Sequence, residues 1–174
     1  YPVTASHDYE RERLSVLLSL LSPGFVAVTT PGAAIRYTMP PSVLRNESMT
    51  LKPGDTIPPA ELAQRLLRIG FAAVDTVEGI GQFARRGGIL DLFSPGEDYR
   101  VRVEFFGDEI DRMGHFDPLT QRLFENCDSL SLLPAKEVLT DGTAREKIKK
   151  AVAHRLAAVK SEAARDTLQR EMHI

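Results

Sequence analysis

Leucines at helical spacing open the chain and are followed by a short apolar run. Between residues 8 and 22 apolar positions recur every three or four residues, which predicts a helix with one buried face that ends at Pro23-Gly24. The run 25–29 predicts a buried strand, and a short turn of helix follows Pro31. Because so few residues cannot close an α/β sheet, we expect 1–48 to be a partial α/β segment that borders a larger domain.

From Met49 the pattern changes to short apolar runs separated by turns. A strand is expected at 49–51, and Pro58-Pro59 opens a helix that stops at Gly70. The helix is expected to turn its apolar residues inward, namely Leu62, Leu66, Leu67 and Ile69. After Gly70 only strands are expected, at 72–77, 82–86, 89–93, 100–106, 109–116 and 129–132. Residues 49–137 therefore predict an α+β domain, an antiparallel sheet with packed helices.

The C-terminal part, 138–174, is expected to be helical. Its apolar residues form a narrow stripe, Ile148, Val152, Leu156, Val159 and Ala163. From residue 143 onward the segment has eight Lys and Arg against four Asp and Glu, so the helix would be locally basic. A solvated face is the usual reason for such a charge excess.

Composition narrows the possible functions. The chain has 22 Lys and Arg against 24 Asp and Glu, a net charge of −2, which is too balanced for general attraction to nucleic acid. The single Cys127 fits a reducing compartment, and no apolar run approaches the roughly 18 residues of a membrane span. We expect a cytoplasmic protein without a membrane segment. Since the chain begins at Tyr1 and no signal peptide pattern follows, we expect it to be a piece of a longer protein.

The sequence predicts no catalytic residue, cofactor or metal. It lacks the P-loop string, and its four histidines and Cys127 have no ligand spacing. A cluster of acids, Glu104, Asp108, Glu109, Asp111 and Asp117, is the one feature that suggests a metal-dependent hydrolase. A tight hairpin turn at Gly107-Asp108, with Glu109 and Asp111 facing water, is the better interpretation.

One strand departs from its own alternation. Along 99–106 one set of side chains is apolar and aromatic, Tyr99, Val101, Val103 and Phe105, whereas the other is Arg100, Arg102, Glu104 and Phe106. A large aromatic beside arginines is typical of a protein interface, so Phe106 is expected to be exposed. The alternative is that Phe106, at a strand end, tucks under a loop.

Two adjacent arginines, Arg85 and Arg86, precede a pair of glycines, and one of them must lie on the outer side of the sheet. A nucleic-acid-binding module could use Arg85, Arg86 and Arg100 together with the basic C-terminal helix. This interpretation stays open as an alternative to a protein interface.

Two motifs carry a family resemblance, QFARRGGILDLF at 82–93 and RVEFFGDEID at 102–111. They resemble the UvrA-interaction domain shared by UvrB and the transcription-repair coupling factor (Mfd). Three later pieces occur in the family's order, Phe116-Asp117, Thr120-Gln121-Arg122 and Leu133-Pro134-Ala135. The resemblance is specific over about 51–137 and weaker upstream, and no motif follows Leu139.

The resemblance implies a non-catalytic adaptor that binds UvrA and interrupts a motor-like domain, pieces of which would flank it. By match, the contact residues are Arg86, Arg102 and Phe106, and Arg85, Arg100 and Glu104 are weaker candidates. We expect these three to form one exposed patch whose truncation weakens binding and leaves folding unchanged. UvrB-like sequences often have a further arginine where Ala84 stands, so that contact would be missing here.

The segment 120–122 and the short path from Gly70 to Arg86 favour the coupling factor over the equivalent domain of UvrB. Such a parent protein would use ATP to translocate on double-stranded DNA, displace stalled RNA polymerase and recruit excision repair. None of the motor motifs lies in this chain.

Overall fold

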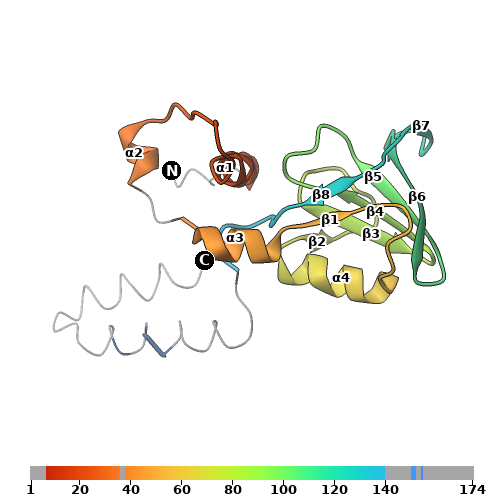
Figure 1. Ribbon diagram of the computed structural model, residues 1–174. Helices are drawn as coiled ribbons and strands as arrows, with labels where there is room; N and C mark the ends of the chain where they lie inside the picture. Colours follow the sequence, from red (N-terminus) through yellow and green to blue (C-terminus); the bar gives the residue numbers. More distant parts are fainter. Residues whose placement is uncertain (1–6, 36–37, 140–149, 152–153, 155–174) are drawn as a thin grey trace. The chain divides into compact units, whose positions relative to one another are not determined.

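A six-stranded sheet with the strand order β2-β3-β4-β5-β6-β7 dominates the computed structural model, which describes residues 7–35, 38–139, 150–151 and 154 (Figure 1). Its strands are β2 (Ala72–Ala73), β3 (Gln82–Arg86), β4 (Ile89–Phe93), β5 (Val101–Phe106), β6 (Glu109–Phe116) and β7 (Leu123–Asn126). Neighbouring strands are antiparallel except β2 and β3, which are parallel. The predicted α+β class is confirmed.

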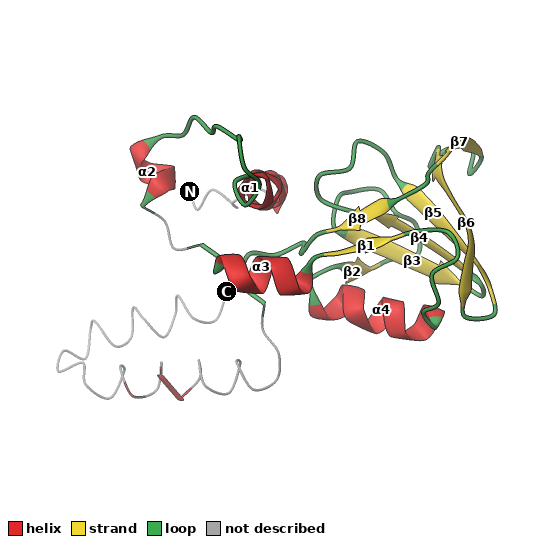
Figure 2. Ribbon diagram, viewed as in Figure 1, coloured by secondary structure: helices red, strands yellow, loops and turns green. Residues whose placement is uncertain are grey.

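A second layer covers one face of this sheet (Figure 2). It consists of α4 (Pro59–Arg68) and a two-stranded antiparallel ribbon of β1 (Met49–Leu51) and β8 (Leu130–Leu132). The core lies between the layers, and its buried residues include Leu62 and Leu66 of α4, Leu90 and Leu92 of β4, Val101 and Val103 of β5, Ile110 and Met113 of β6, and Leu51, Leu130 and Leu132 of the ribbon. We call the other face of the six-stranded sheet the outer face.

The α4 helix forms where the sequence predicts it. Pro59 occupies its first turn, where a missing N–H costs nothing, and Leu62 and Leu66 lie one turn apart on the buried side. Leu67, which was expected to point inward, is instead exposed. The apolar stripe is thus narrower than the sequence suggests, because one helix face is enough to cover the sheet.

Two tight hairpins close the sheet at one end. The turn Gly87-Gly88 joins β3 to β4, and Gly107-Asp108 joins β5 to β6. The first central residue of each turn has a positive φ, +60° at Gly87 and +64° at Gly107, a conformation in which glycine carries no steric penalty. The amide of Phe105 donates to the carbonyl oxygen of Gly88 at 2.8 Å, so the two hairpins are joined at this end of the sheet.

The N-terminal region forms a small second core. Its helices are α1 (His7–Ser19), α2 (Pro31–Ala34) and α3 (Pro41–Glu47). Leu14, Met39 and Leu44 are buried together there. The strand predicted at 25–29 is wrong: no strand forms, and Val26 and Val28 are 84% and 99% exposed. A strand needs a neighbour for its backbone hydrogen bonds, and no described segment provides one.

Other differences from the sequence expectations concern the edges of the sheets. The strand expected at 72–77 is shortened to Ala72–Ala73, β7 was not predicted, and the last expected strand pairs with β1 instead of joining the large sheet.

The α3 helix was also not predicted. The helix expected from residue 143 onward lies almost entirely outside the described residues. The chain divides into two compact units, Tyr1–Leu139 and Thr140–Ile174.

Candidate partner-binding surface

Strand register places most of the candidate residues on the outer face. Val101 and Val103 are wholly buried in the core, so the alternate residues of β5 point to the other side. Two rows of paired residues cross the outer face, Ala84, Asp91, Arg102 and Gly114 in one, and Arg86, Ile89, Glu104 and Arg112 in the next. Phe106 extends this face at the hairpin end, where it pairs with Glu109.

Phe106 is 83% exposed, although it is a large aromatic residue within a strand. It is the last residue of β5, immediately before the Gly107-Asp108 turn. The alternative that its ring tucks under a loop is therefore wrong. An apolar side chain held on a rigid strand and left in water is the kind of group that anchors a protein interface.

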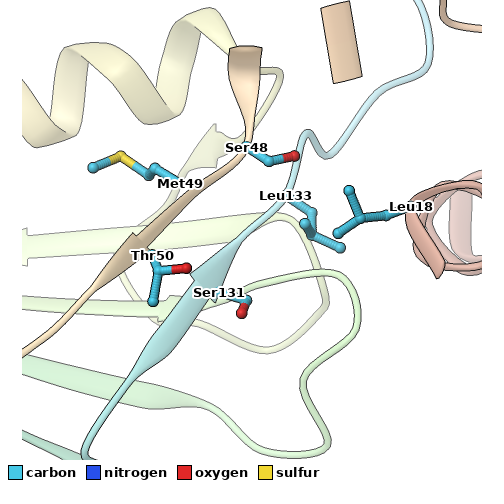
Figure 3. Close-up of a pocket in the computed structure, with 6 residues that line it drawn as sticks. All are labelled: Leu18, Ser48, Met49, Thr50, Ser131 and Leu133. Carbon is cyan, nitrogen blue, oxygen red and sulfur yellow. The ribbon is translucent and has the colours of Figure 1, made fainter. Parts of the chain in front are cut away.

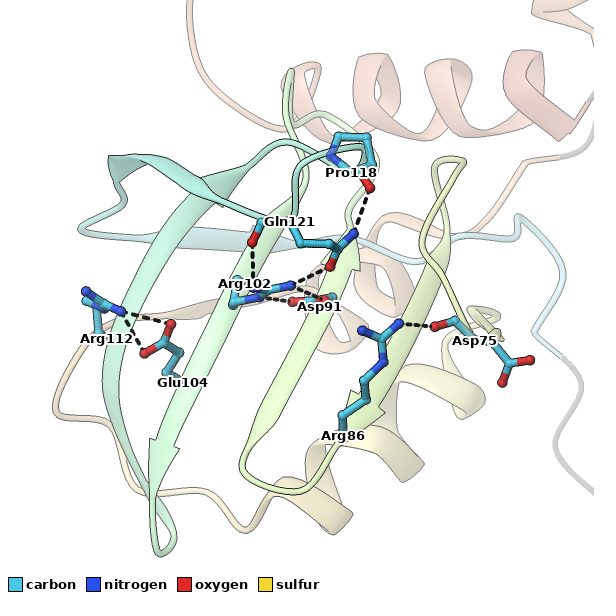
Figure 4. Close-up of polar contacts among 8 residues, drawn as sticks. All are labelled: Asp75, Arg86, Asp91, Arg102, Glu104, Arg112, Pro118 and Gln121. Atoms are coloured by element: carbon cyan, nitrogen blue, oxygen red, sulfur yellow. Dashed lines mark hydrogen bonds and ion pairs between the residues drawn. The ribbon is translucent and has the colours of Figure 1, made fainter.

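Arg102 differs from its expected place in an exposed patch: its side chain is only 14% exposed. Figure 4 shows it enclosed by polar partners on the outer face. Its Nε and Nη2 atoms donate to the two carboxylate oxygens of Asp91 at 2.6 and 2.8 Å. Nη1 donates to the backbone oxygen of Gln121 at 3.0 Å, and Nη2 donates to Oε1 of the same residue at 2.9 Å.

The burial of this pair is possible because the charges satisfy each other. Asp91 is one of the few buried polar residues in the described chain, and its bidentate bond with Arg102 has the geometry of a strong pair. The hydrogen bonds that Arg102 donates to Asp91 raise the pKa of Arg102 despite the desolvation of the guanidinium. The guanidinium also lies over the ring of Phe116, 4.8 Å from its centroid.

Arg100 and Arg86 bind the backbone of the loop 74–81, which joins β2 to β3. Nε of Arg100 donates to the carbonyl oxygen of Val77 at 3.0 Å, and its Nη2 donates to that of Glu78. The guanidinium of Arg100 lies 5.1 Å from the centroid of the Phe93 ring. Arg86 remains exposed, and its Nη2 donates to the backbone oxygen of Asp75 (Figure 4).

Near the hairpin tips the surface is open. Arg85 and Arg86 are both exposed, and Ile89 beside Arg86 is partly exposed. Glu104 is half-buried and accepts two hydrogen bonds from Nη2 of Arg112, at 3.0 and 2.9 Å. We define the outer patch as Arg86, Ile89, Glu104, Phe106 and Arg112.

Sequence reasoning missed Arg112. Phe106 pairs with Glu109 and Phe105 with Ile110, so regular pairing would place Asp111 opposite Glu104. A bulge shifts the register between Glu104 and Phe105, and Arg112 takes that place instead. Without knowledge of this bulge, simple alternation cannot assign Arg112 to the outer face.

The rest of the described chain offers little for catalysis. The acids that suggested a hydrolase are dispersed: Glu104 binds Arg112, Asp117 accepts from the amides of its own loop, and the remaining three are exposed. Within the described ranges, no three His, Cys, Asp or Glu side chains gather as a metal site would require.

A hollow of about 150 Å³ is lined by Leu18, Ser48, Met49, Thr50, Ser131 and Leu133, none of which is titratable (Figure 3). Among the described helices, none has the length and apolar character needed to cross a membrane.

Comparison with known proteins assigns the sheet and its covering layer to a family. Residues 49–138 match the family model described as the UvrB interaction domain. The chain belongs to this family. The UvrB interaction domain is an interaction module of DNA-repair proteins, not a catalytic one, and here it carries the outer patch.

Relatives of two kinds contain this domain. The UvrABC system protein B of Kosmotoga olearia is 37% identical over 142 residues, which cover 82% of this chain and 21% of that protein. The transcription-repair-coupling factor of Bacillus subtilis is 33% identical over 169 residues, 94% of this chain and 14% of that protein. The factor of Escherichia coli is 35% identical over 141 residues, 80% and 12% of the two chains. The chain thus spans about a fifth or less of the length of these relatives.

Proposed function

We propose that this chain is the adaptor portion of a transcription-repair coupling factor, and that it recruits UvrA to DNA damage at stalled RNA polymerase. Residues 120–122 and the short path from Gly70 to Arg86 support the coupling factor. The Bacillus subtilis coupling factor also aligns over 94% of the chain, against 82% for the Kosmotoga olearia UvrB. The equivalent domain of UvrB is the alternative, and it would use the same surface.

The observation that carries this proposal is the exposure of Phe106 on the same face of the sheet as Arg86 and Arg112. Phe106 can enter an apolar pocket of a partner, and Arg86 and Arg112 of the outer patch can pair with carboxylates around that pocket. Arg85 is also exposed, but it pairs with Leu90 on the other face of the sheet, so it adds positive charge only to the neighbouring hairpin. The outer patch therefore fits a partner that has an apolar pocket with an acidic rim. We propose that UvrA is this partner.

The candidate residues take different parts in this proposal. Arg86 and Phe106 are the direct contacts, and Glu104 of the outer patch assists. Arg85 pairs with the buried Leu90 and so belongs to the other face of the sheet, where it remains exposed. Arg100 and Arg102 use their donors inside the domain, so we assign them to the support of the surface. ATP-driven translocation on double-stranded DNA and displacement of RNA polymerase would belong to other parts of the parent protein.

Replacing Phe106 with alanine tests the proposal. Since hot-spot side chains typically contribute about 2 kcal/mol or more, Phe106→Ala should weaken binding of purified UvrA by roughly 30-fold. Its melting temperature should stay within about a degree of the parent value, because an exposed ring contributes little to the core.

Phe124→Ala is the matched control, since Phe124 is a second partly exposed phenylalanine, on β7, outside the outer patch. It should bind UvrA at full strength. Unchanged binding by Phe106→Ala would overturn the proposal. Strong, salt-sensitive binding of the chain to DNA, lost on replacing Arg85 and Arg86, would instead favour the nucleic-acid alternative.

A further inference from the structure

We propose that Arg102 is a positioning residue for partner binding: it holds the loop 117–122 against the outer face, and this loop presents Leu119 as a second apolar contact. The proposal rests on the proposed function, because it concerns the same partner, and it extends the surface beyond the outer patch. The loop joins β6 to β7 at the end of the sheet away from the two hairpins, and it returns over β5 to reach Arg102 (Figure 4).

The loop is fixed by its own hydrogen bonds. Oδ1 of Asp117 accepts from the amides of Leu119 and Thr120 at 2.7 and 3.2 Å, and the carbonyl oxygen of Asp117 accepts from the amide of Gln121 at 2.8 Å. The side-chain amide of Gln121 donates to the carbonyl oxygen of Pro118 at 2.7 Å. The loop backbone therefore has a defined conformation before any partner binds, which lowers the entropy cost of binding.

Gln121 connects this loop to Arg102. It is the one non-glycine residue of the described chain with a positive φ, +60°, a conformation that is uncommon for residues with a side chain. Both its backbone oxygen and its Oε1 accept hydrogen bonds from Arg102. These two bonds come from a guanidinium that Asp91 has already fixed, so Arg102 connects the loop to the buried part of the sheet.

The geometry favours an indirect role for Arg102 in binding, because most of its donors are already used. Four of the five N–H groups of its guanidinium donate to Asp91 or Gln121, and its side chain is 14% exposed. A carboxylate of the partner would have to displace one of these bonds. Loss of Arg102 instead releases the loop that it holds.

Leu119 is the apolar residue that the fixed loop exposes to a partner. It lies at the tip of the loop and is 92% exposed, more than Phe106 itself. Phe106 lies four residues beyond Arg102 along β5, about 13 Å at the usual rise of a strand. Because Leu119 belongs to the loop that Arg102 holds, one partner surface of ordinary size can reach both apolar groups.

The test is a double-mutant cycle in which the affinity of purified UvrA for the full chain is measured. Leu119→Ala and Arg102→Lys should each weaken binding by at least roughly 5-fold. Arg102→Lys keeps the positive charge beside Asp91 but cannot reproduce the fork of bonds to Gln121. Because both changes act through one loop, the double variant should bind no more weakly than Arg102→Lys alone. Leu67→Ala, at an exposed leucine of α4, is the matched control and should bind normally.

Two further measurements keep the proposal falsifiable. Asp117→Ala leaves the Arg102–Asp91 pair intact but removes the acceptor for the amides of Leu119 and Thr120, so it should also weaken UvrA binding. Hydrogen exchange at the amides of residues 119–121 should accelerate in Arg102→Lys.

The outcomes separate this proposal from the proposed function. If the parent chain binds UvrA and Phe106→Ala weakens that binding while Leu119→Ala has no effect, only the role of the loop is overturned. Multiplicative effects of Leu119→Ala and Arg102→Lys would show that Arg102 contacts UvrA directly and would overturn its positioning role. Absence of UvrA binding by the parent chain would overturn both proposals.

Discussion

Two arginine–carboxylate pairs on the same face of the sheet differ in what they do. Asp91 and Arg102 are largely withdrawn from water, with side-chain exposures of 6% and 14%, whereas Glu104 and Arg112 are considerably more exposed. In the first pair, each charge depends on the other for solvation. In the second, water and salt screen the attraction, so the pair contributes little to stability and either member can be used to bind a partner.

Arg102→Ala should therefore destabilise the fold. It leaves the Asp91 carboxylate buried without its partner, and breaking such a pair typically costs about 3–5 kcal/mol. Arg112→Ala is the matched control and should cost less than about 1 kcal/mol. Urea unfolding of both variants measures the difference. The sequence instead predicts that truncation of Arg102 leaves folding unchanged, and equal midpoints for the two variants would support that prediction.

The thiol of Cys127 should make stability depend on alkaline pH. Burial raises the pKa of this thiol, which donates a hydrogen bond to the carbonyl oxygen of Ser129 at 2.8 Å. In the unfolded chain the thiol ionises near pH 8.5, whereas the folded protein retains the proton to higher pH. The stability is thus fully present below about pH 8.5 and falls as the pH rises toward the folded-state pKa.

Melting temperatures at pH 7 and pH 9.5 test this expectation. The parent chain should lose more stability between these two values than Cys127→Ala, which has no group to ionise at this position. An equal loss in both proteins would mean that other groups account for the alkaline dependence.

At the scale of elements, the sequence predicted those whose residues carry a strong local pattern. The strands β3 to β6 alternate or have turn glycines at their ends, and α4 has Pro59 at its start and buried leucines one turn apart. The β7 strand escaped prediction because it is an edge strand with exposed Phe124, Glu125 and Asn126, and so has no core-facing alternation.

The same reasoning explains which parts of the site were predictable. The exposure of Phe106 follows from alternation, which a single strand contains in full. The enclosure of Arg102 does not, because it depends on Gln121, which returns from a loop 19 residues later in the chain. Local pattern can place a side chain on a face, but it cannot show what another segment brings to that face.

At the scale of the molecule, the large core closes within the UvrB interaction domain. Its buried members run from Leu51 to Ala135, and the ribbon of β1 and β8 joins the two ends of this span. The N-terminal helices α1 and α3 contribute to a separate small cluster around Leu14 and Leu44. The domain therefore contains both layers that its core requires.

A fragment of residues 49–137 should accordingly fold alone. It should melt in one cooperative transition and resist limited proteolysis, because every buried residue of the large core in the described part of the chain lies within it. Circular dichroism against temperature and a trypsin time course check this. A broad melt with rapid cleavage would show that the flanking segments are needed, and in that case 49–137 is not a domain boundary.

The two loops that border the outer face are both bound by arginines of β5 and its flank, in part through their backbone oxygens. Arg100 binds the backbone oxygens of Val77 and Glu78, and Arg102 binds the backbone oxygen of Gln121, an atom that every amino acid possesses. A substitution at the exposed Glu78 thus leaves the acceptor of its arginine in place. Evolution can alter what these loops display to a partner while the strands that hold them stay constant, so paralogous proteins can acquire different selectivities from one inherited scaffold.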